Sequence, residues 1–296
     1  MRRIVLFLAT NIAVLLLLAI VCRLFGIDQM ASANGYGGMT GLLLYAAVFG
    51  MGGAFISLAL SKWIAKRSTG ARVITQPRNE TERWLLDTVR QHARNAGIGM
   101  PEVAIYDAPE MNAFATGMTR NSSLVAVSSG LLQQMDREQV SAVLGHEIGH
   151  VANGDMVTLT LIQGVLNTLV ILAARVVGRA IDSWMSGGRD ENRGGGLGYF
   201  MVVMVLQVVF GLFASMIVAA FSRWREFRAD SAGAQFAGRG AMISALQRLK
   251  ADHGENTLPS TIAAFGISGP LADGLRRLFM SHPPLDERIA ALQNAA

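Results

Sequence analysis

Four long apolar stretches dominate the pattern of hydrophobic and polar positions along the chain. They cover residues 4–21, 42–60, 156–174 and 197–221. As helices, all four are long enough to cross the roughly 30 Å of hydrocarbon in a bilayer. The first could also be a signal peptide, but bulky residues follow it instead of a small-residue cleavage site, which favours an uncleaved anchor. The pattern therefore predicts four membrane-spanning helices.

The segment between the second and third apolar stretches shows helical and then strand periodicity. A helix with one apolar face is expected between Asn79 and Gly97. Three short strands are expected after it, at residues 102–106, 111–118 and 123–128. These strands predict a small sheet.

A second helix of this segment is predicted to begin at Asp136. Gln139 stands three residues after Asp136, which is the spacing of a capping box, and apolar residues follow at Val140, Leu144 and Ile148. We expect the small sheet to pack on this helix. After the fourth apolar stretch, the periodicity predicts further helices over residues 222–233, 240–250 and 284–293.

These elements group into two membrane hairpins and two soluble parts. The hairpins are expected at residues 1–61 and 156–221, and the soluble parts at residues 62–155 and 222–296. The predicted fold class is a mainly α membrane protein with four transmembrane helices and an α+β core that carries a small sheet. Because each hairpin crosses the bilayer twice, the two soluble parts can meet on one surface.

Composition and charge support this division. The chain has 296 residues, of which 51% are hydrophobic and 16% are charged, and its mean hydropathy is +0.37. Basic residues follow the second and fourth spans, namely Lys62, Lys66, Arg67, Arg72 and Arg78, and Arg223, Arg225 and Arg228. The positive-inside rule then predicts that both soluble parts and both termini are cytoplasmic. Topology accounts for the net charge of +5, so no nucleic-acid partner is expected. The lone cysteine, Cys22, excludes an internal disulfide and a cysteine-based metal cluster.

A candidate metal-binding motif, His146-Glu147-Ile148-Gly149-His150, lies on the helix that begins at Asp136. Side chains four residues apart share a helix face, so His146 and His150 can converge on one metal ion. Glu147 is rotated by about 100° and can reach a water on that ion. The alternative is two ordinary histidines beside a surface carboxylate.

A second stretch, residues 222–233, supplies a third ligand for such a site. Glu226 and Asp230 lie four residues apart on a probable helix face. Glu226 can complete a His-His-Glu set, and Asp230 can accept the ring N–H of a ligating histidine. The alternative is an acidic pair in a salt-bridged helix face, since Arg223, Arg225 and Arg228 surround it.

Two further candidates concern the substrate. Asn112, Ala113 and Phe114 belong to a strand of small and polar residues, which suits an edge strand that pairs with an extended peptide. An ordinary half-buried strand is an equally good interpretation. His282 could approach the reacting oxyanion as a donor, although a histidine before two prolines is more often a turn residue.

Together the three motifs resemble peptidase family M48, the zinc metallopeptidases. They are His146 to His150, Glu226-Phe227-Arg228-Ala229-Asp230 and Ser281-His282-Pro283-Pro284, and with four spans at these positions the chain resembles the bacterial inner-membrane members. The resemblance implies a cytoplasmic gluzincin-like core with one Zn²⁺ per chain. It also implies proteolysis of damaged or misfolded membrane proteins in membrane quality control and stress response, alongside other membrane proteases.

The same resemblance implies roles for individual residues. His146, His150 and Glu226 would be the zinc ligands, and Glu147 and His282 would be catalytic. Asp230 would hold a ligating histidine. Asn112, Ala113 and Phe114 would bind substrate.

Three other functions remain open at this point. An intramembrane metalloprotease is disfavoured, because charged residues flank both halves of the proposed site. A prenyl-peptide protease of the same family is a second possibility, but that branch has more spans. A four-helix membrane scaffold without enzymatic activity is the third, and it predicts no stoichiometric zinc.

Overall fold

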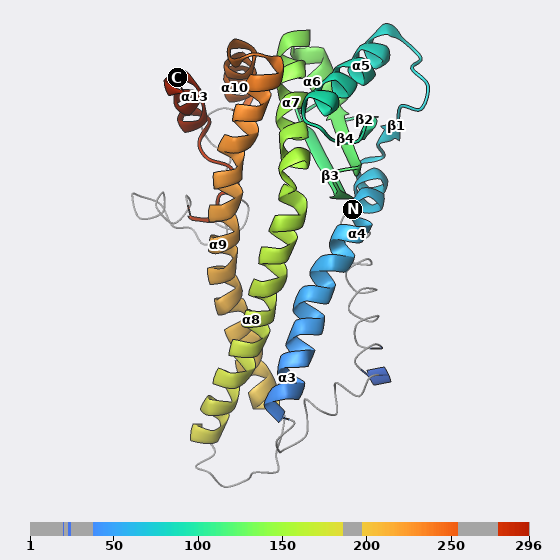
Figure 1. Ribbon diagram of the computed structural model, residues 1–296. Helices are drawn as coiled ribbons and strands as arrows, with labels where there is room; N and C mark the ends of the chain where they lie inside the picture. The colour runs from blue at the N-terminus through green and yellow to red at the C-terminus, as the bar shows by residue number, and fades with distance from the viewer. Residues whose placement is uncertain (1–19, 21–22, 25–37, 186–196, 254–277, 296) are drawn as a thin grey trace. The chain divides into compact units, whose positions relative to one another are not determined.

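The computed structural model describes residues 20, 23–24, 38–185, 197–253 and 278–295 (Figure 1). The first predicted span, residues 4–21, lies outside this part of the chain apart from Ile20. The chain divides into two compact units. One comprises residues 58–159 and 219–296, and the other comprises essentially residues 3–57 and 160–218.

The described residues contain three helices that are long and apolar enough to cross a membrane. The first candidate, Gly41–Thr69, runs through α3 (Gly38–Ala47), the π-helical turn η1 (Val48–Gly52) and α4 (Gly53–Thr69). The others are α8 (Asp155–Met185) and α9 (Leu197–Ala237). They correspond to the second, third and fourth apolar stretches, so three of the predicted spans are confirmed as helices of the required length.

Helix α9 differs from the sequence-based expectation in one respect. The sequence predicts a span that ends near Phe221 and a separate soluble helix over residues 222–233. The structure has one continuous helix of 41 residues. The physical reason is that neither Gly nor Pro stands between Phe221 and Asp230, so nothing in the sequence interrupts the backbone hydrogen bonds.

Small residues permit close packing within the unit that contains the apolar helices. A Cβ on Gly164 of α8 would lie 2.7 Å from the sulfur of Met51, and a Cβ on Gly50 would meet the backbone of Thr168 at 2.4 Å. The approach at Gly50 therefore requires glycine, because it is backbone that a Cβ would meet, whereas at Gly164 the flexible side chain of Met51 would have to move. Close helix contacts of this kind are typical of membrane bundles, where packing rather than water exclusion holds helices together.

The other unit contains a four-stranded sheet in the order β1-β2-β4-β3. The strands are β1 (Arg72–Val73), β2 (Glu102–Tyr106), β3 (Ala113–Thr119) and β4 (Ser122–Ser128). β2 and β4 are parallel, and the other two pairs are antiparallel. The three predicted strands are thus confirmed. β3 lies at an edge of this sheet, and its register with β4 shifts at a bulge between Gly117 and Thr119.

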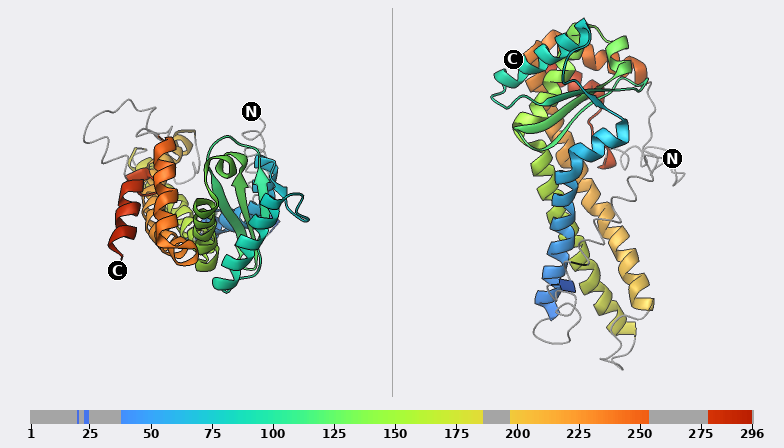
Figure 2. Two further views of the ribbon diagram at one scale, coloured as in Figure 1. Left: turned by 90° about the horizontal axis from the view of Figure 1, so that it is seen from above. Right: turned by 90° about the vertical axis from the view of Figure 1, so that its right-hand side faces the viewer.

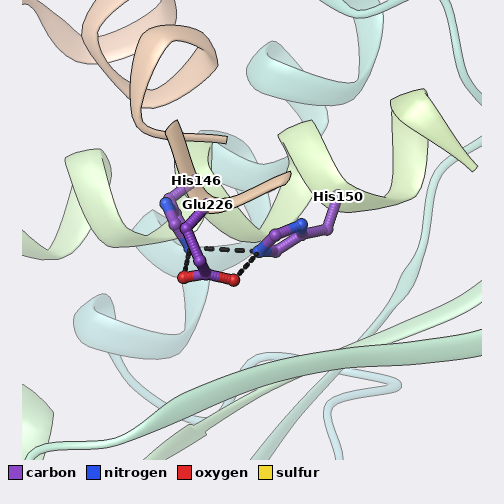
Figure 3. A group of neighbouring side chains, drawn as sticks. All are labelled: His146, His150 and Glu226. Carbon is purple, nitrogen blue, oxygen red and sulfur yellow. Dashed lines mark hydrogen bonds and ion pairs between the residues drawn. The ribbon is translucent and has the colours of Figure 1, made fainter. Parts of the chain in front are cut away.

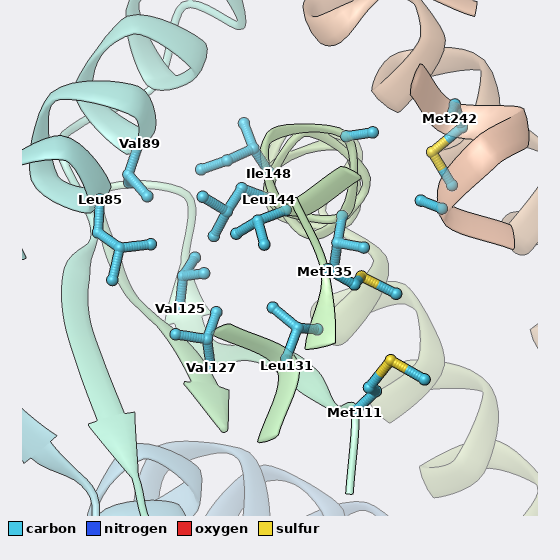
Figure 4. Close-up of a cluster of buried hydrophobic side chains, with 14 of the residues drawn as sticks. Leu85, Val89, Met111, Val125, Val127, Leu131, Met135, Leu144, Ile148 and Met242 are labelled. Atoms are coloured by element: carbon cyan, nitrogen blue, oxygen red, sulfur yellow. The ribbon is translucent and has the colours of Figure 1, made fainter. Parts of the chain in front are cut away.

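One face of the sheet carries the main hydrophobic core (Figure 4). Val125 and Val127 of β4 meet α5 (Glu80–Asn95), α6 (Ser129–Gln134) and α7 (Arg137–Asn153) there. Leu144 and Ile148 of α7 are fully buried in this core. The opposite face carries a smaller cluster with Ala104, Tyr106, Leu124 and Ala126.

Two further helices complete this unit. α10 (Arg239–His253) packs against α7 and against α13 (Leu285–Asn294). Both were expected from the sequence within a few residues. Figures 1 and 2 show α7 between the sheet on one side and α10 on the other. Helix α7 is therefore the central element of the unit, and its side chains are held from two sides.

Candidate metal centre

The site is built on α7, whose two ends are defined by the sequence. The side chain of Asp136 accepts a hydrogen bond from the backbone N–H of Gln139 at 2.8 Å, and the side chain of Gln139 accepts one from the backbone N–H of Asp136 at 3.1 Å. This capping box, predicted above, fixes the start of the helix. The helix ends at Gly154, which has the left-handed conformation (φ 70°) that glycine adopts without strain.

Glycines on α7 allow α9 to come unusually close. A Cβ on Gly149 would lie 2.7 Å from the Cβ of Ala232, and a Cβ on Gly145 would lie 3.2 Å from the Cα of Gly233. No larger residue fits at Gly149 without a shift of one helix. This approach brings Glu226 of α9 next to the two histidines of α7.

His146, His150 and Glu226 converge on one point in the interior (Figure 3). The two imidazole Nε2 atoms are 3.2 Å apart. The carboxylate of Glu226 is 3.6 Å from Nε2 of His146 and 3.3 Å from Nε2 of His150. All three side chains are buried, and Glu226 has no exposed surface. The arrangement matches a cation site with two nitrogen ligands and one oxygen ligand.

A carboxylate holds the far nitrogen of each histidine ring. Asp230 lies 2.9 Å from Nδ1 of His146, and Asp155 lies 2.7 Å from Nδ1 of His150. A carboxylate at neutral pH only accepts, so each Nδ1 carries the hydrogen. In the neutral rings both Nε2 lone pairs then point into the same small space, where they repel each other unless a cation or a proton lies between them.

Arg288 of α13 contacts Asp230, the carboxylate that holds His146. Its side chain is buried and donates two hydrogen bonds to Asp230, from Nε at 2.7 Å and from Nη2 at 2.5 Å. Burial lowers the pKa of Arg288, but the bonds to Asp230 outweigh this effect and raise it. The bidentate pair fixes Asp230, and Asp230 in turn fixes the ring of His146.

The carboxylates around the two histidines favour a compensating positive charge on the rings. Burial alone would lower the pKa of His150, but the hydrogen bond to Asp155 and the nearby carboxylate of Glu226 raise it to about 9. The pKa of His146 is also raised, because the hydrogen bond to Asp230 and the nearby carboxylate of Glu226 outweigh its burial. A divalent cation supplies the same compensation without protonating the ligands. The site is therefore electrostatically suited to a cation.

The two residues predicted to act in catalysis have different surroundings. Glu147 is half-buried on α7 beside the histidines. His282 is largely exposed, with 61% of its side-chain surface accessible, and its Nδ1 lies 2.8 Å from Glu226. The structure thus brings His282 to the proposed third ligand from the solvent side.

The three predicted substrate-binding residues lie at the start of the edge strand β3 and have different surroundings. Asn112 precedes β3, and both of its backbone polar groups are bonded to Ser128, at 2.9 and 3.1 Å. Ala113 packs against the main core on the α7 face of the sheet. Phe114 lies on the opposite face, where its ring is 5.6 Å from that of Tyr106. Because strand side chains alternate between faces, Ala113 and Phe114 lie on opposite sides of the sheet, and the role of these residues in substrate binding stays a prediction.

Two residues of the site were not found from the sequence. Asp155 follows His150 by five residues, beyond a glycine, and the histidine-to-aspartate spacing across Gly154 was the available signal. Arg288 lies six residues after His282 in the last helix, and no local pattern connects it to Asp230. Only the folded chain brings Arg288 to the site.

The part of the chain that carries this site matches a known family. The sequence model of peptidase family M48 matches residues 79–296. The chain belongs to peptidase family M48. It is 64% identical over 294 residues to a protein named Protease HtpX from Xanthomonas oryzae, which covers 99% of this chain and 98% of the relative. It is also 64% identical to Protease HtpX from Xanthomonas campestris, over 99% of this chain and 97% of that protein.

A solved structure shares the M48 fold. The crystal structure of S. mikatae Ste24p superposes with a TM-score of 0.60 and 18% sequence identity, and the match covers 97% of this chain and 66% of that one. At this identity the likeness concerns the fold alone. Family membership, the apolar helices and the relatives at 64% identity identify the chain as a membrane metalloprotease of family M48.

Proposed function

We propose that the protein is a zinc-dependent endopeptidase in which His146, His150 and Glu226 hold the metal. Ligand atoms at about 2.0–2.1 Å from a tetrahedral zinc ion are roughly 3.3 Å apart. The two Nε2 atoms are 3.2 Å apart, and Nε2 of His150 and of His146 lie 3.3 and 3.6 Å from Oε1 and Oε2 of Glu226, respectively, which is close to that value. Oε1 of Glu226 is also buried and accepts no hydrogen bond from the described part of the chain. This convergence is the observation that carries the proposal.

Each side chain of the proposed site has a task in peptide hydrolysis. Bound zinc would supply an activated water and polarise the scissile carbonyl. Glu147 takes the proton from the attacking water and gives it to the leaving amine. Asp230 and Asp155 keep both Nε2 lone pairs directed at the metal, and Arg288 holds Asp230. His282, on the exposed side of Glu226, is placed to donate to the substrate.

The substrates we propose are damaged or misfolded membrane proteins, as the resemblance of the three motifs implies; the relatives at 64% identity are named as proteases. The site would lie on the cytoplasmic side of a bacterial inner membrane, with both termini on that side. Four spans, including residues 4–21, would anchor it. The clusters of basic residues after the second and fourth spans support this orientation. Other membrane proteases would share the same quality-control task.

The alternatives fit the observations less well. A scaffold without activity does not explain two buried histidines whose Nε2 atoms face each other and a buried carboxylate. A prenyl-peptide protease is not favoured, because relatives that match over 98% of their length are named Protease HtpX. A zinc site deep in the bilayer is not favoured either, because Arg223, Arg225 and Arg228 lie around Glu226 on α9.

The proposal is tested by metal content and cleavage of casein or a misfolded membrane protein. The full-length protein, Glu147→Gln and Glu226→Ala are compared after identical purification. We expect one zinc per chain in the first two proteins, little in the third, and cleavage by the parent alone. A folded parent without zinc, or equal turnover by Glu147→Gln, would refute the assignment.

A further inference from the structure

A cavity of about 300 Å³ opens where the β3–β4 hairpin meets the turn between α7 and α8. Its walls come from the hairpin, the end of β4 and the turn, namely Thr116 to Arg120, Ser123, Val151, Asn153, Gly154 and Met156 to Thr158. These segments belong to one compact unit. None of the residues assigned above to metal binding or catalysis lines this cavity.

Two small residues create the cavity. On the face of β4 that meets α7, the side chains in order are Val127, Val125 and Ser123. The last of these, at the end of the core, is smaller than the two valines. Opposite Ser123 on β3 stands Gly117, where a Cβ would lie 2.4 Å from a backbone oxygen. The sheet therefore has no side chain to fill this end of its contact with α7.

The hydroxyl of Ser123 lacks a partner there. The residue is 3% exposed, lines the cavity, and its Oγ makes no hydrogen bond within the described residues. A buried hydroxyl without a partner costs free energy, because it loses its hydrogen bonds to water on folding and gains none in the protein. Such a group in a cavity wall indicates a ligand that brings a complementary polar atom.

The cavity adjoins the metal centre along α7. Val151, which follows His150, lines it, as do both neighbours of Asp155. Gly154 is four residues beyond His150, which is about 6 Å along the helix axis. An extended peptide covers about 3.3 Å per residue, so the cavity is about two to four peptide residues from the metal.

The residues that line the cavity indicate which kind of substrate side chain would fit in it. Val151, Met156 and Val157 provide apolar surface, while the exposed Arg120 lies against Gly154 near the opening. A cationic side chain would meet the charge of Arg120, and a small side chain would leave the cavity unfilled. A large side chain with an apolar body and a neutral polar tip fits best, because its tip can bond to Ser123.

We propose that this cavity is a specificity subsite that receives a tyrosine side chain two to four residues from the scissile bond. The inference rests on the proposed function. A peptide that pairs with the free edge of β3 runs from the metal centre toward Gly117 and the bulge, and its side chain enters beside Ser123. Tyrosine is then preferred over phenylalanine, and both over lysine.

The test moves one tyrosine through an otherwise alanine and serine peptide and maps the bond cut by the zinc-loaded, full-length protein. We expect the cut to move with the tyrosine at a constant separation of about two to four residues. Phenylalanine should direct the cut about fivefold less efficiently, which is the worth of one ordinary hydrogen bond. A cut whose position ignores the tyrosine would overturn the proposal.

Two serine variants isolate the hydroxyl. Ser123→Ala should cleave the tyrosine and phenylalanine peptides equally, whereas Ser122→Ala, an exposed neighbour on the other face of β4, should behave as the parent. A purely structural Ser123 would change both peptides alike. Val157→Trp, which fills the cavity, should abolish the preference, while Leu161→Trp, one turn further along α8, should retain it.

A binding measurement separates failure of the subsite from failure of the proposed function. Fluorescence anisotropy with the zinc-loaded Glu147→Gln protein, which should hold peptides without cutting them, reports the tyrosine preference directly. If the parent cuts no peptide but binding still shows the Ser123-dependent preference, the function fails and the subsite stands. If the parent cuts peptides and neither assay shows the preference, the subsite alone is refuted.

Discussion

Asp155 accepts a hydrogen bond of 2.7 Å from Nδ1 of His150, across the helix end at Gly154. The two residues are five apart in sequence, and both are buried. The left-handed Gly154 interrupts the helix between them, and Asp155, the first residue of α8, bonds back to the last turn of α7. In the same way Asp230 holds His146, and each ligating ring thus has its own carboxylate.

The first prediction concerns this carboxylate. Asp155→Asn keeps the shape of the side chain but allows its amide to donate to Nδ1, which favours the wrong tautomer of His150. We expect zinc affinity to fall by about 10- to 100-fold, as measured by competition with a chelator. Asp87→Asn, an exposed change on α5, serves as the control. Unchanged affinity would show that Asp155 does not orient the ring.

The second prediction concerns the contact between α7 and α9. Gly149→Ala places a Cβ 2.7 Å from that of Ala232 and should push the helices apart, with a loss of about 1–3 kcal/mol in stability and a weaker metal site. Gly240→Ala is the matched control, because nothing lies near that position and alanine favours the helix. The measurements are the thermal unfolding and the zinc content of both variants. Equal behaviour of the two variants would contradict the requirement for glycine.

Arg288→Lys provides the third prediction. Lysine keeps the charge but cannot reproduce the two parallel bonds to Asp230. Part of the buried carboxylate is left unsatisfied, and we expect a loss of about 1–3 kcal/mol in stability. The zinc affinity and the rate of peptide cleavage of this variant should also fall. Arg248→Lys, whose Nε bonds only to a backbone carbonyl on the surface, should leave all three measurements unchanged.

The fourth prediction concerns His92, which joins α5 to α7. Its Nε2 lies 3.0 Å from the hydroxyl and 3.1 Å from the carbonyl oxygen of Ser141. Burial lowers the pKa of His92, and the bond to Ser141 only partly offsets this. The folded state therefore binds this proton less readily than the unfolded state.

Stability contributed by neutral His92 is complete above the ordinary pKa of 6.5 and is lost as pH falls below it. The difference in unfolding free energy between the zinc-loaded parent and His92→Gln should therefore shrink from pH 7.5 to pH 5.5. Taking the difference removes the contribution of the metal ligands, which both proteins share. A difference that is constant or grows toward acid pH would show that the histidine is not held neutral.

The sequence by itself determined the local helices and strands, and the two histidines of the candidate metal site. Apolar stretches of span length, the capping box at Asp136 and the spacing of His146 and His150 depend on residues close together in the chain. Helical and strand periodicities report such short-range order directly. For the same reason the sequence placed β3 correctly as a strand, and the mixed composition of that strand suggested the edge position.

Only the tertiary structure decided which distant groups meet. Arg288 reaches Asp230 because α13 docks on α10 and α10 on α7, and no pattern within α13 records that contact. That Phe114 lies on the sheet face away from the main core was also settled by packing, because a strand pattern does not state which face meets α7. The cavity beside Ser123 likewise depends on Gly117 of the neighbouring strand. Packing between segments far apart in sequence sets these relationships, and a single sequence carries no periodic signal for them.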